Sequence, residues 1–326
     1  MPELPEVESV RRSVEPLIVG RSVERATLHR RDVLVAPGDP AGGFARQRLA
    51  PSSGKSIRPK RITPADLLVG AIVRRVERRG KQLAIIAGPA DRSAADSGLI
   101  AMGVQLGMSG HLQFLPRGVP APSAHLHAEW IFENGRLLFH DPRRFGGLRV
   151  FRSLDALNEH WQALGPDALT IRPDDLIAAL AHTRRAIKAA LLDQSVIAGV
   201  GNIYADEALH ISGIHPARRA DLLDPETLVN LADAIRNVLS DSIDAGGSTL
   251  RDYADANGRP GSYQAAHAVY GRAGEACRTC GTALVSDLLA QRTTVWCPQC
   301  QPKAGSRNRR VMHISDPARS WAAPTR

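Results

Sequence analysis

Apolar residues recur at helical spacing near the start of the chain. Behind Pro5, every third or fourth position carries one of them: Val7, Val10, Val14 and Leu17. A proline fits the first turn of a helix, because the amide hydrogen that it lacks has no helical partner there. The pattern predicts a short amphipathic helix from Glu6 to Leu17.

Short β-rich runs alternate with turn residues between about residues 71 and 151. They cover residues 71–76, 82–87, 128–132, 136–140 and 148–151. Asn134-Gly135 separates two of these runs and is a strong signal for a tight hairpin turn. This half of the chain is predicted to be a β-sandwich or a barrel.

Beyond Pro166 the apolar spacing becomes helical. Helices are predicted over residues 174–182, 184–194, 202–212 and 225–244. The last of them has Asp224 as N-cap, Pro225 at its first position and Gly246-Gly247 behind its end. The predicted fold class is therefore α+β, with an N-terminal β-sandwich preceded by a short helix and a mostly helical second domain.

A chain of 326 residues is too long for one small domain. We expect a β-sandwich domain over residues 1–152, a helical domain over 153–265 and a cysteine-containing module over 266–301. Residues 37–64 are rich in Pro, Gly and Ser and are interpreted as a basic loop inserted into the first domain. Residues 302–326 are polar and basic and are predicted to form a disordered tail.

Composition excludes several classes of protein. With 43% hydrophobic and 23% charged residues, the chain has a globular composition rather than that of a disordered or coiled-coil protein. No run of apolar residues is long enough to predict a membrane span. Glu3, Glu6 and Glu8 stand where a secretory signal needs basic residues. We expect a cytoplasmic protein with no membrane partner.

The formal net charge of +9 favours a polyanionic partner such as nucleic acid. Residues 37–64 hold six Lys and Arg against Asp39, and residues 301–326 hold six against Asp316, so each segment contributes +5. The rest of the chain is then at about −1. Binding by the globular body must depend on local basic clusters rather than on overall charge.

All four cysteines lie within one stretch of 24 residues, which leaves none to join distant segments by disulfides. Cys277 and Cys280, then sixteen residues, then Cys297 and Cys300 have the spacing of a zinc site. Four sulfur ligands leave no open position for water, so we expect one structural Zn²⁺. Four reduced cysteines without metal are the alternative. Arg292, between the two pairs, stands where a zinc-held hairpin would present it to a phosphate.

Sequence blocks along nearly all of residues 1–301 resemble a single family. They are MPELPEVESVRR at the start, LGMSGHL (106–112), DPRRFGG (141–147), AGVGNIYADEALHISGIHP (198–216), GGSTLRDY (246–253), NGRPGSYQ (257–264), VYGRAGEACRTCG (269–281) and CPQCQ (297–301). Together, and in this order, they resemble the bacterial formamidopyrimidine-DNA glycosylases, although any one block alone would be a weak signal.

The resemblance implies a bifunctional enzyme of base-excision repair whose partner is damaged double-stranded DNA. Such an enzyme removes oxidised purines, including 8-oxoguanine and formamidopyrimidines. It then cleaves the abasic site by β,δ-elimination through a Schiff base with the N-terminal proline. The resemblance also implies a helix-two-turns-helix element in the helical domain, a zinc-finger hairpin, a monomeric state and a place near the nucleoid of a bacterium.

The catalytic residues that the resemblance implies are Pro2, Glu3 and Lys81. Once Met1 is removed, Pro2 presents a secondary amine with a pKa near 8, of which roughly a tenth is neutral at pH 7 and able to attack a sugar carbon. A plain helix-entry proline is the alternative. Glu3 would protonate the sugar ring oxygen, or would only complement a helix dipole. Lys81 would reach the damaged base and a phosphate, or would be one charge in a solvated basic turn.

Further residues are implied in handling the damaged base. Glu6 matches a second acid near the lesion pocket, with a solvated helix residue as the alternative. Extruding a base leaves a gap in the duplex, which Met108, Arg143 and Phe145 would fill. Without the resemblance, Met108 and Phe145 would be interpreted as core residues and Arg143 as a surface charge. Tyr263 would belong to the lesion pocket.

The resemblance also implies contacts with the DNA backbone. Asn202 and the amides beside it would hold a phosphate together with Arg292. Lys188 is a further match, with a helix-surface charge as the alternative. Arg251 lies in the segment that folds over the extruded base in this family.

Two rival functions remain open at this stage, and one position departs from the family pattern. Endonuclease VIII, the sister glycosylase for oxidised pyrimidines, is one rival, although Leu4 and the intact DPRRFG block favour the purine enzyme. The other is a non-catalytic zinc-containing protein that binds damaged DNA, which would need Asn202 but neither Pro2 nor Glu3. Gln105 stands where many relatives have a phosphate-contacting histidine.

Overall fold

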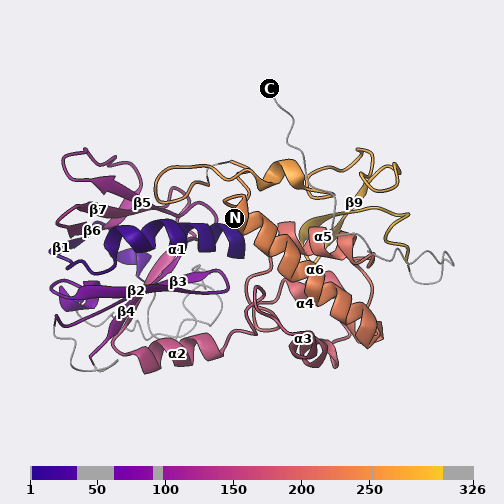
Figure 1. Cartoon of the computed structure of the whole chain (residues 1–326), viewed down its shortest axis with the longest axis horizontal. Coiled ribbons are helices and arrows are strands. Elements are labelled where there is room, and N and C mark those ends of the chain that lie inside the picture. The colour runs from indigo at the N-terminus through magenta and orange to yellow at the C-terminus, as the bar shows by residue number, and fades with distance from the viewer. Residues whose placement is uncertain (1, 35–61, 91–97, 252, 304–326) are drawn as a thin grey trace, which may run out of the picture.

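The computed structural model describes residues 2–34, 62–90, 98–251 and 253–303, and there the chain forms two halves that meet near the N-terminus (Figure 1). One half holds two β-sheets, and the other holds most of the helices. The predicted basic loop up to residue 61 and the predicted tail from residue 304 lie outside the described residues. Among the described helices, none has the length and apolar content that a membrane crossing requires.

Helix α1 (Leu4–Ile18) confirms the predicted N-terminal helix. The apolar face predicted from the spacing is the buried one, since Val7, Val10 and Val14 are at most 1% exposed. These three residues join the core of the β-rich half. The helix therefore runs along the sandwich with its N-terminal end at the junction of the two halves (Figure 1).

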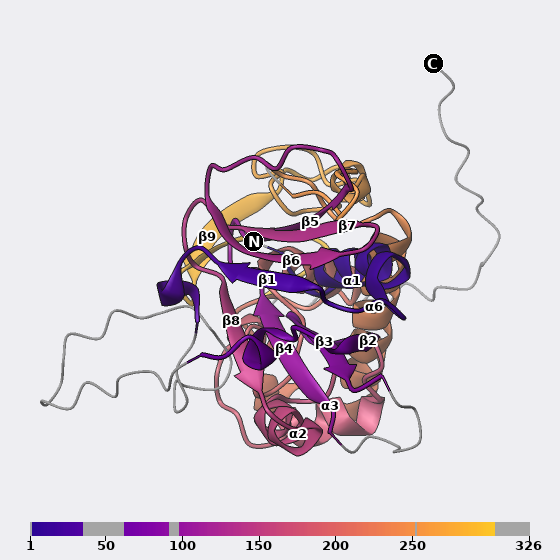
Figure 2. The ribbon, with the colours of Figure 1, turned by 90° about the vertical axis from the view of Figure 1, so that its left-hand side faces the viewer.

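Two antiparallel four-stranded sheets form the predicted β-sandwich, in strand orders β1-β6-β7-β5 and β2-β3-β4-β8. Figure 2 shows them as two layers, one above the other. The strands are β1 (Arg25–Leu28), β2 (Ile72–Arg79), β3 (Gln82–Gly88), β4 (Ile100–Gln105), β5 (His111–Pro116), β6 (Leu126–Phe132), β7 (Gly135–His140) and β8 (Gly147–Phe151). One apolar core takes side chains from both layers, including Val76 of β2 and Trp130 of β6.

The five strands predicted from β-rich runs are all present, and the predicted hairpin connects β6 to β7. Three further strands, β1, β4 and β5, escaped prediction. Strand β4 is buried on both faces over residues 101–104, so it shows no alternation of apolar and polar residues, and Gly103 weakens its β-propensity. Strand β1 has only four residues and lies at a sheet edge.

The helical half contains α3 (Pro173–Leu180), α4 (Ile187–Leu191), α5 (Asn202–Ile211) and α6 (Pro225–Asp244). Helix α2 (Leu154–Gln162) precedes them but packs on the sandwich, where Leu157 shares a small core with Ile86 and Phe151. Helix α6 has its predicted bounds, and the Asp224 side chain caps it by accepting a hydrogen bond from the Thr227 amide at 2.8 Å. Helix α4 is shorter than predicted, because Ala186, just before it, pairs with Arg219 in an isolated β-bridge. Helix α2 was not predicted.

The first turn of α1 crosses from one half to the other. Leu4 packs in the core of the helical half, whereas Val7, one turn later, packs in the sandwich core. Gly199 permits this approach: its φ is +118°, and a Cβ there would lie 2.4 Å from Leu4 Cδ1. Helix α1 is therefore shared by the two halves.

The zinc-finger hairpin is formed by β9 (Val285–Leu289) and β10 (Arg292–Trp296), which pair antiparallel. Ala290 and Gln291 make the turn with φ of 49° and 59°, as a tight two-residue hairpin requires. Cys277, Cys297 and Val295 belong to a small core of this module. With this module in place, the predicted α+β fold class is confirmed.

Candidate active site

Glu3 lies at the junction of the two halves and binds the start of α5. Its carboxylate accepts hydrogen bonds from the backbone amides of Ile203 at 3.0 Å and Tyr204 at 3.5 Å, and the residue is 2% exposed. These amides lie in the first turn of α5, where N–H groups have no helical partner and the helix dipole favours a negative charge. Glu3 therefore joins α1 to α5 through a buried carboxylate.

The Gly-Val-Gly segment before α5 forms the socket that receives the N-terminus. The amide of Leu4 donates a hydrogen bond to the carbonyl of Gly199 at 3.2 Å. A Cβ on Gly201 would lie 2.3 Å from Cδ of Glu3, so a larger residue would displace the carboxylate. Pro2, directly before Glu3, is buried at the same junction. The socket holds Pro2 and Glu3 in one place relative to α5.

Glu6, one turn along α1, is a second buried acid. Its Oε1 accepts hydrogen bonds from the Tyr204 hydroxyl at 2.5 Å and the Ser248 amide at 2.8 Å, and its Oε2 accepts one from the Glu3 amide at 2.8 Å. Burial and the nearby charge of Glu3 raise the pKa of Glu6. The interpretation of Glu6 as a solvated helix residue is wrong, because it is 1% exposed.

Lys81 lies in the turn between β2 and β3, within reach of the charges of this site. Burial lowers the pKa of Lys81, while the charges of Glu3 and Glu6 act to raise it and that of Arg292 to lower it. Lys81 is half-buried rather than fully solvated. The structure thus brings Lys81 to the predicted residues Glu3 and Glu6, although it lies 75 or more residues from both along the chain.

Asp167 and Arg78 hold the turn that carries Lys81. The Asp167 carboxylate accepts hydrogen bonds from the amide of Gly80 at 2.8 Å and from Nη1 of Arg78 at 2.7 Å. Arg78 also donates from Nε to Glu8 of α1 at 3.0 Å. Sequence reasoning missed this network because its partners lie 70 and 89 residues away from Arg78, with no local pattern to join them.

Lys188 of α4 lies under the zinc hairpin with no exposed surface. Its ammonium pairs with Asp206 at 2.7 Å and donates hydrogen bonds to the Thr294 hydroxyl at 2.8 Å and the Thr293 carbonyl at 3.2 Å. Both interpretations of Lys188, as a helix-surface charge and as a direct contact to the DNA backbone, are therefore wrong, because its side chain is fully buried and paired within the protein. Lys188 instead holds β10 in place through its hydrogen bonds to Thr293 and Thr294.

Asn202, at the start of α5, also binds β10. Its amide Nδ2 donates a hydrogen bond to the Thr293 carbonyl at 2.9 Å. The Val295 amide donates to Asp206 at 3.1 Å, so α5 holds this strand at two points. Arg292, at the start of β10, remains exposed. Asn202 and Arg292 thus lie at the same end of β10, but the two amides that follow Asn202, predicted to hold a phosphate, instead donate to the Glu3 carboxylate.

Met108, Arg143 and Phe145 extend from two loops of the sandwich. Met108 is 44% and Phe145 38% exposed, so the interpretation of these two as core residues is wrong. Arg143 is also exposed, and its guanidinium carbon lies 5.0 Å from the centre of the Phe145 ring. An exposed thioether, ring and guanidinium are the groups that could replace a missing base in a duplex.

Asp141 joins the two loops. Its carboxylate accepts hydrogen bonds from the Ser109 hydroxyl at 2.6 Å and the Gly146 amide at 2.7 Å, and the Arg143 amide donates to that hydroxyl at 3.0 Å. Gln105, where a histidine is common in the resembled family, ends β4 opposite Gly147. The hydrogen bonds of Asp141 and Ser109 therefore join the loop that carries Met108 to the loop that carries Arg143 and Phe145.

Tyr263 lies beside Tyr204, whose hydroxyl binds Glu6. Its ring centre is 6.2 Å from that of Tyr204 and 5.8 Å from that of His267. Arg251, in the same stretch of chain, is exposed. Glu207 of α5 anchors the end of this stretch by accepting hydrogen bonds from three successive backbone amides, those of residues 268–270. Tyr204, His267 and Glu207 were not singled out in the sequence, because each reads there as an ordinary core or helix residue.

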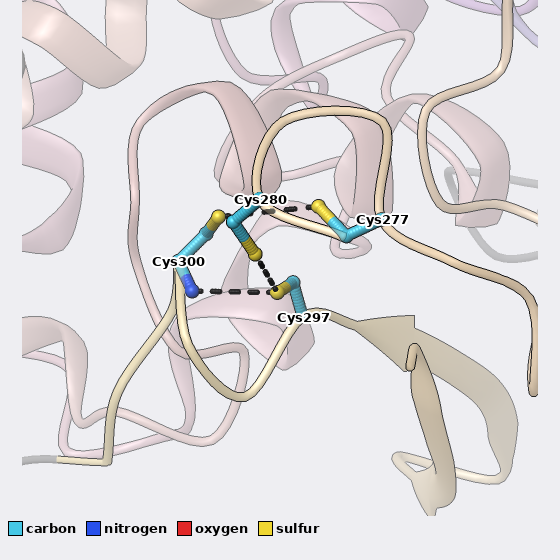
Figure 3. Close-up of side chains that lie close together, drawn as sticks. All are labelled: Cys277, Cys280, Cys297 and Cys300. Atoms are coloured by element: carbon cyan, nitrogen blue, oxygen red, sulfur yellow. Dashed lines mark hydrogen bonds between the residues drawn. The ribbon is translucent and has the colours of Figure 1, made fainter. Parts of the chain in front are cut away.

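The four cysteines converge on one point (Figure 3). Their sulfur atoms all lie within 4.8 Å of one another, with Cys280 to Cys297 at 3.4 Å and Cys277 to Cys300 at 3.9 Å. Sulfurs bonded at about 2.3 Å to one tetrahedral Zn²⁺ lie about 3.8 Å apart, so the arrangement fits this ion. The predicted single structural zinc, held by Cys277, Cys280, Cys297 and Cys300, is thereby confirmed.

Backbone amides support two of these sulfur atoms. The amide of Thr279 donates to Cys277 Sγ and that of Cys300 to Cys297 Sγ, both at 3.4 Å. Such bonds orient and stabilise thiolate ligands. Gln301 anchors the module to the helical half, since its side-chain nitrogen donates to the Ile214 carbonyl at 2.8 Å.

Three family models match this chain in the order of its parts. The formamidopyrimidine-DNA glycosylase N-terminal domain matches residues 1–148, and the H2TH domain of the same glycosylases matches residues 164–254. A zinc finger found in these glycosylases and in isoleucyl-tRNA synthetase matches residues 274–303. Together the matches cover most of the chain, and the chain belongs to the formamidopyrimidine-DNA glycosylase family.

Individual relatives agree with this assignment. Formamidopyrimidine-DNA glycosylase of Xanthomonas euvesicatoria is 41% identical over 304 residues, which are 92% of this chain and all of that protein. The crystal structure of the Fpg (MutM) protein of Thermus thermophilus has a TM-score of 0.74 at 34% identity, covering 93% of this chain and 100% of that one. A Lactococcus lactis Fpg variant in complex with Fapy-dG-containing DNA has a TM-score of 0.75 at 29% identity, with the same coverage.

Proposed function

We propose that the chain is a bifunctional DNA glycosylase and abasic-site lyase of base-excision repair, acting on oxidised purines in duplex DNA. The observation that carries this proposal is the socket at the start of α5. It buries Pro2 and Glu3 beside a second acid and within the field of Lys81. Neither a helix-entry proline nor a plain DNA-binding module needs this arrangement.

The chemistry begins at the Pro2 amine once Met1 has been removed. The neutral nitrogen forms a bond to C1′ of the damaged nucleotide, the glycosidic bond breaks, and the electron pair leaves with the base. Glu3 protonates the ring oxygen of the sugar, which opens the ring. The nitrogen loses its own proton and becomes an iminium, whose positive charge is permanent because a secondary amine has no second proton to lose.

The iminium acidifies the adjacent C2′ carbon. Removal of a C2′ proton expels the 3′ phosphate by β-elimination, and a second elimination expels the 5′ phosphate. A group that cycles between acid and base is needed for these steps, and Glu3 is placed to do this. Lys81 would hold the damaged base and a neighbouring phosphate close to that carboxylate.

DNA would be held from three sides. Arg292 and Asn202 would grip a phosphate at the zinc hairpin, while Met108, Arg143 and Phe145 would fill the gap that the extruded nucleotide leaves. Tyr263 and Arg251 would cover the extruded base. Zinc supplies no chemistry in this scheme and holds the hairpin that carries Arg292. Lys188 would act on DNA indirectly by supporting that hairpin.

We further propose that the protein works as a monomer in the bacterial cytoplasm near the nucleoid, and that its functional division is 1–152 catalytic, 153–265 helical, 266–301 zinc finger and 302–326 tail. A monomer is sufficient because the described residues alone assemble every group that the scheme uses.

Borohydride trapping tests the central step. Reduction during reaction with a duplex containing 8-oxoguanine converts the iminium into a stable amine, and peptide mass analysis should place the adduct on Pro2. An adduct on Lys81 would contradict the assignment. Wild-type protein with an undamaged duplex is the control and should trap nothing.

Oxidised pyrimidines belong in the same assay as a second substrate class. A Lactococcus lactis Fpg has been crystallised with an oxidised-pyrimidine-containing DNA, so a relative accommodates such a lesion. Faster trapping on oxidised purines than on oxidised pyrimidines supports the proposal, and the reverse order favours the endonuclease VIII type.

A further inference from the structure

A continuous file of buried polar groups leads away from Glu6. Glu6 Oε1 lies 2.5 Å from the Tyr204 hydroxyl, which lies 3.3 Å from the Ser248 hydroxyl, which lies 3.0 Å from Nε2 of His267. All four residues are at most 4% exposed. The scheme above gives no task to Tyr204, Ser248 or His267, so this file is an unexplained feature of the site.

His267 is suited to end such a file, because its imidazole can take up and release a proton and its Nε2 lies 3.0 Å from the Ser248 hydroxyl. The rings of Tyr263 and Tyr270 stand edge-on to it at 5.8 and 5.5 Å. Burial lowers the pKa of His267 and the charge of Arg278 acts the same way, whereas the charge of Glu207 and a backbone hydrogen bond with Tyr270 raise it. Burial is the largest of these influences, so the pKa of His267 is lowered, which favours release of its proton towards Ser248.

We propose that Glu6, Tyr204, Ser248 and His267 form a relay that passes one proton between Glu6 and His267 during base excision. The relay rests on the proposed function, because it serves the acid beside the lesion pocket. Glu6 touches the reacting region, whereas His267 acts only through the two hydroxyls between them.

The two end states of the relay contain the same atoms and one mobile proton. With the proton on His267, Nε2 donates to Ser248, the Ser248 hydroxyl donates to Tyr204, and the Tyr204 hydroxyl donates to the Glu6 carboxylate. When each hydrogen moves one step along, Glu6 becomes a neutral acid and His267 a neutral imidazole that accepts from Ser248. Both states satisfy every hydrogen bond of the file.

The relay would supply Glu6 with a proton while burial separates it from bulk water. A departing base must take up a proton, and burial together with the charge of Glu3 raises the pKa of Glu6, which favours its protonated form. Glu6 is 1% exposed, so bulk water does not readily reload it during the chemical step. His267 stores the proton within the closed site and is reloaded from water between turnovers.

A matched pair of serine variants tests the relay. Ser248 and Ser242 both contact the Tyr204 hydroxyl, Ser242 at 2.6 Å, but only Ser248 continues to His267. Single-turnover excision of 8-oxoguanine at saturating enzyme should slow by about tenfold in Ser248→Ala and stay within about twofold in Ser242→Ala. Equal slowing in both variants, or in neither, overturns the relay.

The pH profile of excision tests the role of His267 itself. His267→Gln keeps a hydrogen-bonding side chain that cannot store a proton. When two groups share one proton, its apparent pKa exceeds that of either group alone, so loss of His267 should move the alkaline limb to lower pH, by about 0.3 unit if the two hold it equally. His267→Leu should move it in the same direction. A His267→Gln profile that superimposes on that of the wild type shows a structural role only.

Failure of the relay is distinguishable from failure of the proposed function. Nicking of a duplex with a preformed abasic site bypasses base departure and should stay within about twofold in all these variants, which also shows that they fold. A wild-type protein that excises no oxidised base overturns the proposed function. A wild-type protein that excises normally, beside unaltered Ser248→Ala and His267→Gln variants, overturns the relay alone.

Discussion

Helix α5 binds two buried polar clusters that differ in how their charges are balanced. At its first turn, Glu3 and Glu6 bring two carboxyl groups together, and these accept hydrogen bonds from backbone amides and from the Tyr204 hydroxyl. One turn further along α5, the Asp206 carboxylate forms an ion pair with the ammonium of Lys188 at 2.7 Å. One cluster concentrates negative charge, and the other neutralises it.

The two arrangements suit different tasks. Burial raises the pKa of Asp206 to about 6 even though Lys188 and the Val295 amide act to lower it, so the carboxyl group depends on its partners to stay charged. A closed buried pair of this kind fixes two elements together. Among the described residues no ion pair within 4 Å closes the acid pair at the first turn, although Lys81 lies near enough to interact with both charges. A carboxyl group with a displaced pKa in a buried site is what acid–base chemistry needs.

The strongest prediction from this comparison concerns the closed pair. Lys188→Met leaves the Asp206 carboxylate buried without its cation and should lower the free energy of unfolding by about 3–5 kcal/mol. Urea unfolding of the zinc-loaded protein measures this. Affinity for undamaged duplex should fall too, because β10 loses the support that positions Arg292.

Arg185→Met is the matched control for this prediction. Arg185 pairs with Asp193 at 2.8 Å, but its side chain is 46% exposed. Exposed pairs contribute at most about 1 kcal/mol, so the control should unfold nearly as the wild type does. A Lys188 variant as stable as this control would show that the buried pair does not hold the hairpin.

The same pair shows what the sequence could and could not predict. The cysteine spacing predicted the zinc hairpin, and the apolar spacing over residues 202–212 predicted α5, because both signals are local. The burial of Lys188 depends on Asp206 and Thr294, which reach it only after α4, α5 and β10 have packed. No spacing within α4 distinguishes such a lysine from a surface charge.

The acid pair Glu3 and Glu6 gives the next largest expected effect, which is on catalysis. Glu3→Gln keeps an oxygen for the Ile203 amide but removes the proton donor, so excision of 8-oxoguanine should fall by at least about 100-fold. Nicking of preformed abasic sites should survive in part, because no base has to be expelled there. Single-turnover assays on both duplexes measure the two activities. Parallel loss of both would contradict the role given to Glu3.

A third prediction uses the ion network behind the Lys81 turn. Burial acts to raise the pKa of Glu8, but Arg11 and Arg78 outweigh it and bring that pKa to about 2. Because the folded-state pKa lies below the unfolded one of about 4.5, the stabilisation is complete above pH 4.5 and is lost as the pH falls through 2. Glu8→Gln should lower the free energy of unfolding by about 2 kcal/mol at pH 7.

The size of this difference should depend on pH. Urea unfolding at several pH values should show the gap between wild type and Glu8→Gln shrinking from pH 4.5 towards pH 2. Asp175→Asn, which removes an exposed partner of Arg172, is the control and should show no comparable trend. A gap that is constant with pH would mean that packing, rather than charge, explains the effect.

Local signals predicted the fold better than the contacts between its parts. The caps of α6 gave its bounds, and the Asn134-Gly135 turn located a hairpin, because each acts over a few residues. The sandwich strand β4 carried no alternation to detect. The socket that joins Leu4 and Glu3 to Gly199 and Gly201 spans nearly 200 residues, and neither the local patterns nor the family resemblance predicted it.

The smallest expected effect concerns the two basic segments outside the described residues. The sequence predicts these segments over residues 37–64 and 301–326. Because Gln301 is buried in the zinc module and the described residues begin again at Ile62, the deletions are confined to residues 37–61 and 304–326. We expect these segments to act as electrostatic arms for duplex DNA. Each phosphate contact that is lost should flatten the slope of log affinity against log salt by about 0.9.

The double deletion, with a short Gly-Ser linker replacing 37–61, should show this in binding titrations at several salt concentrations. Single-turnover excision at saturating enzyme should stay unchanged, because the socket and the acid pair remain. An unchanged salt slope would show that the arms take no part in binding and that the folded body makes the phosphate contacts alone.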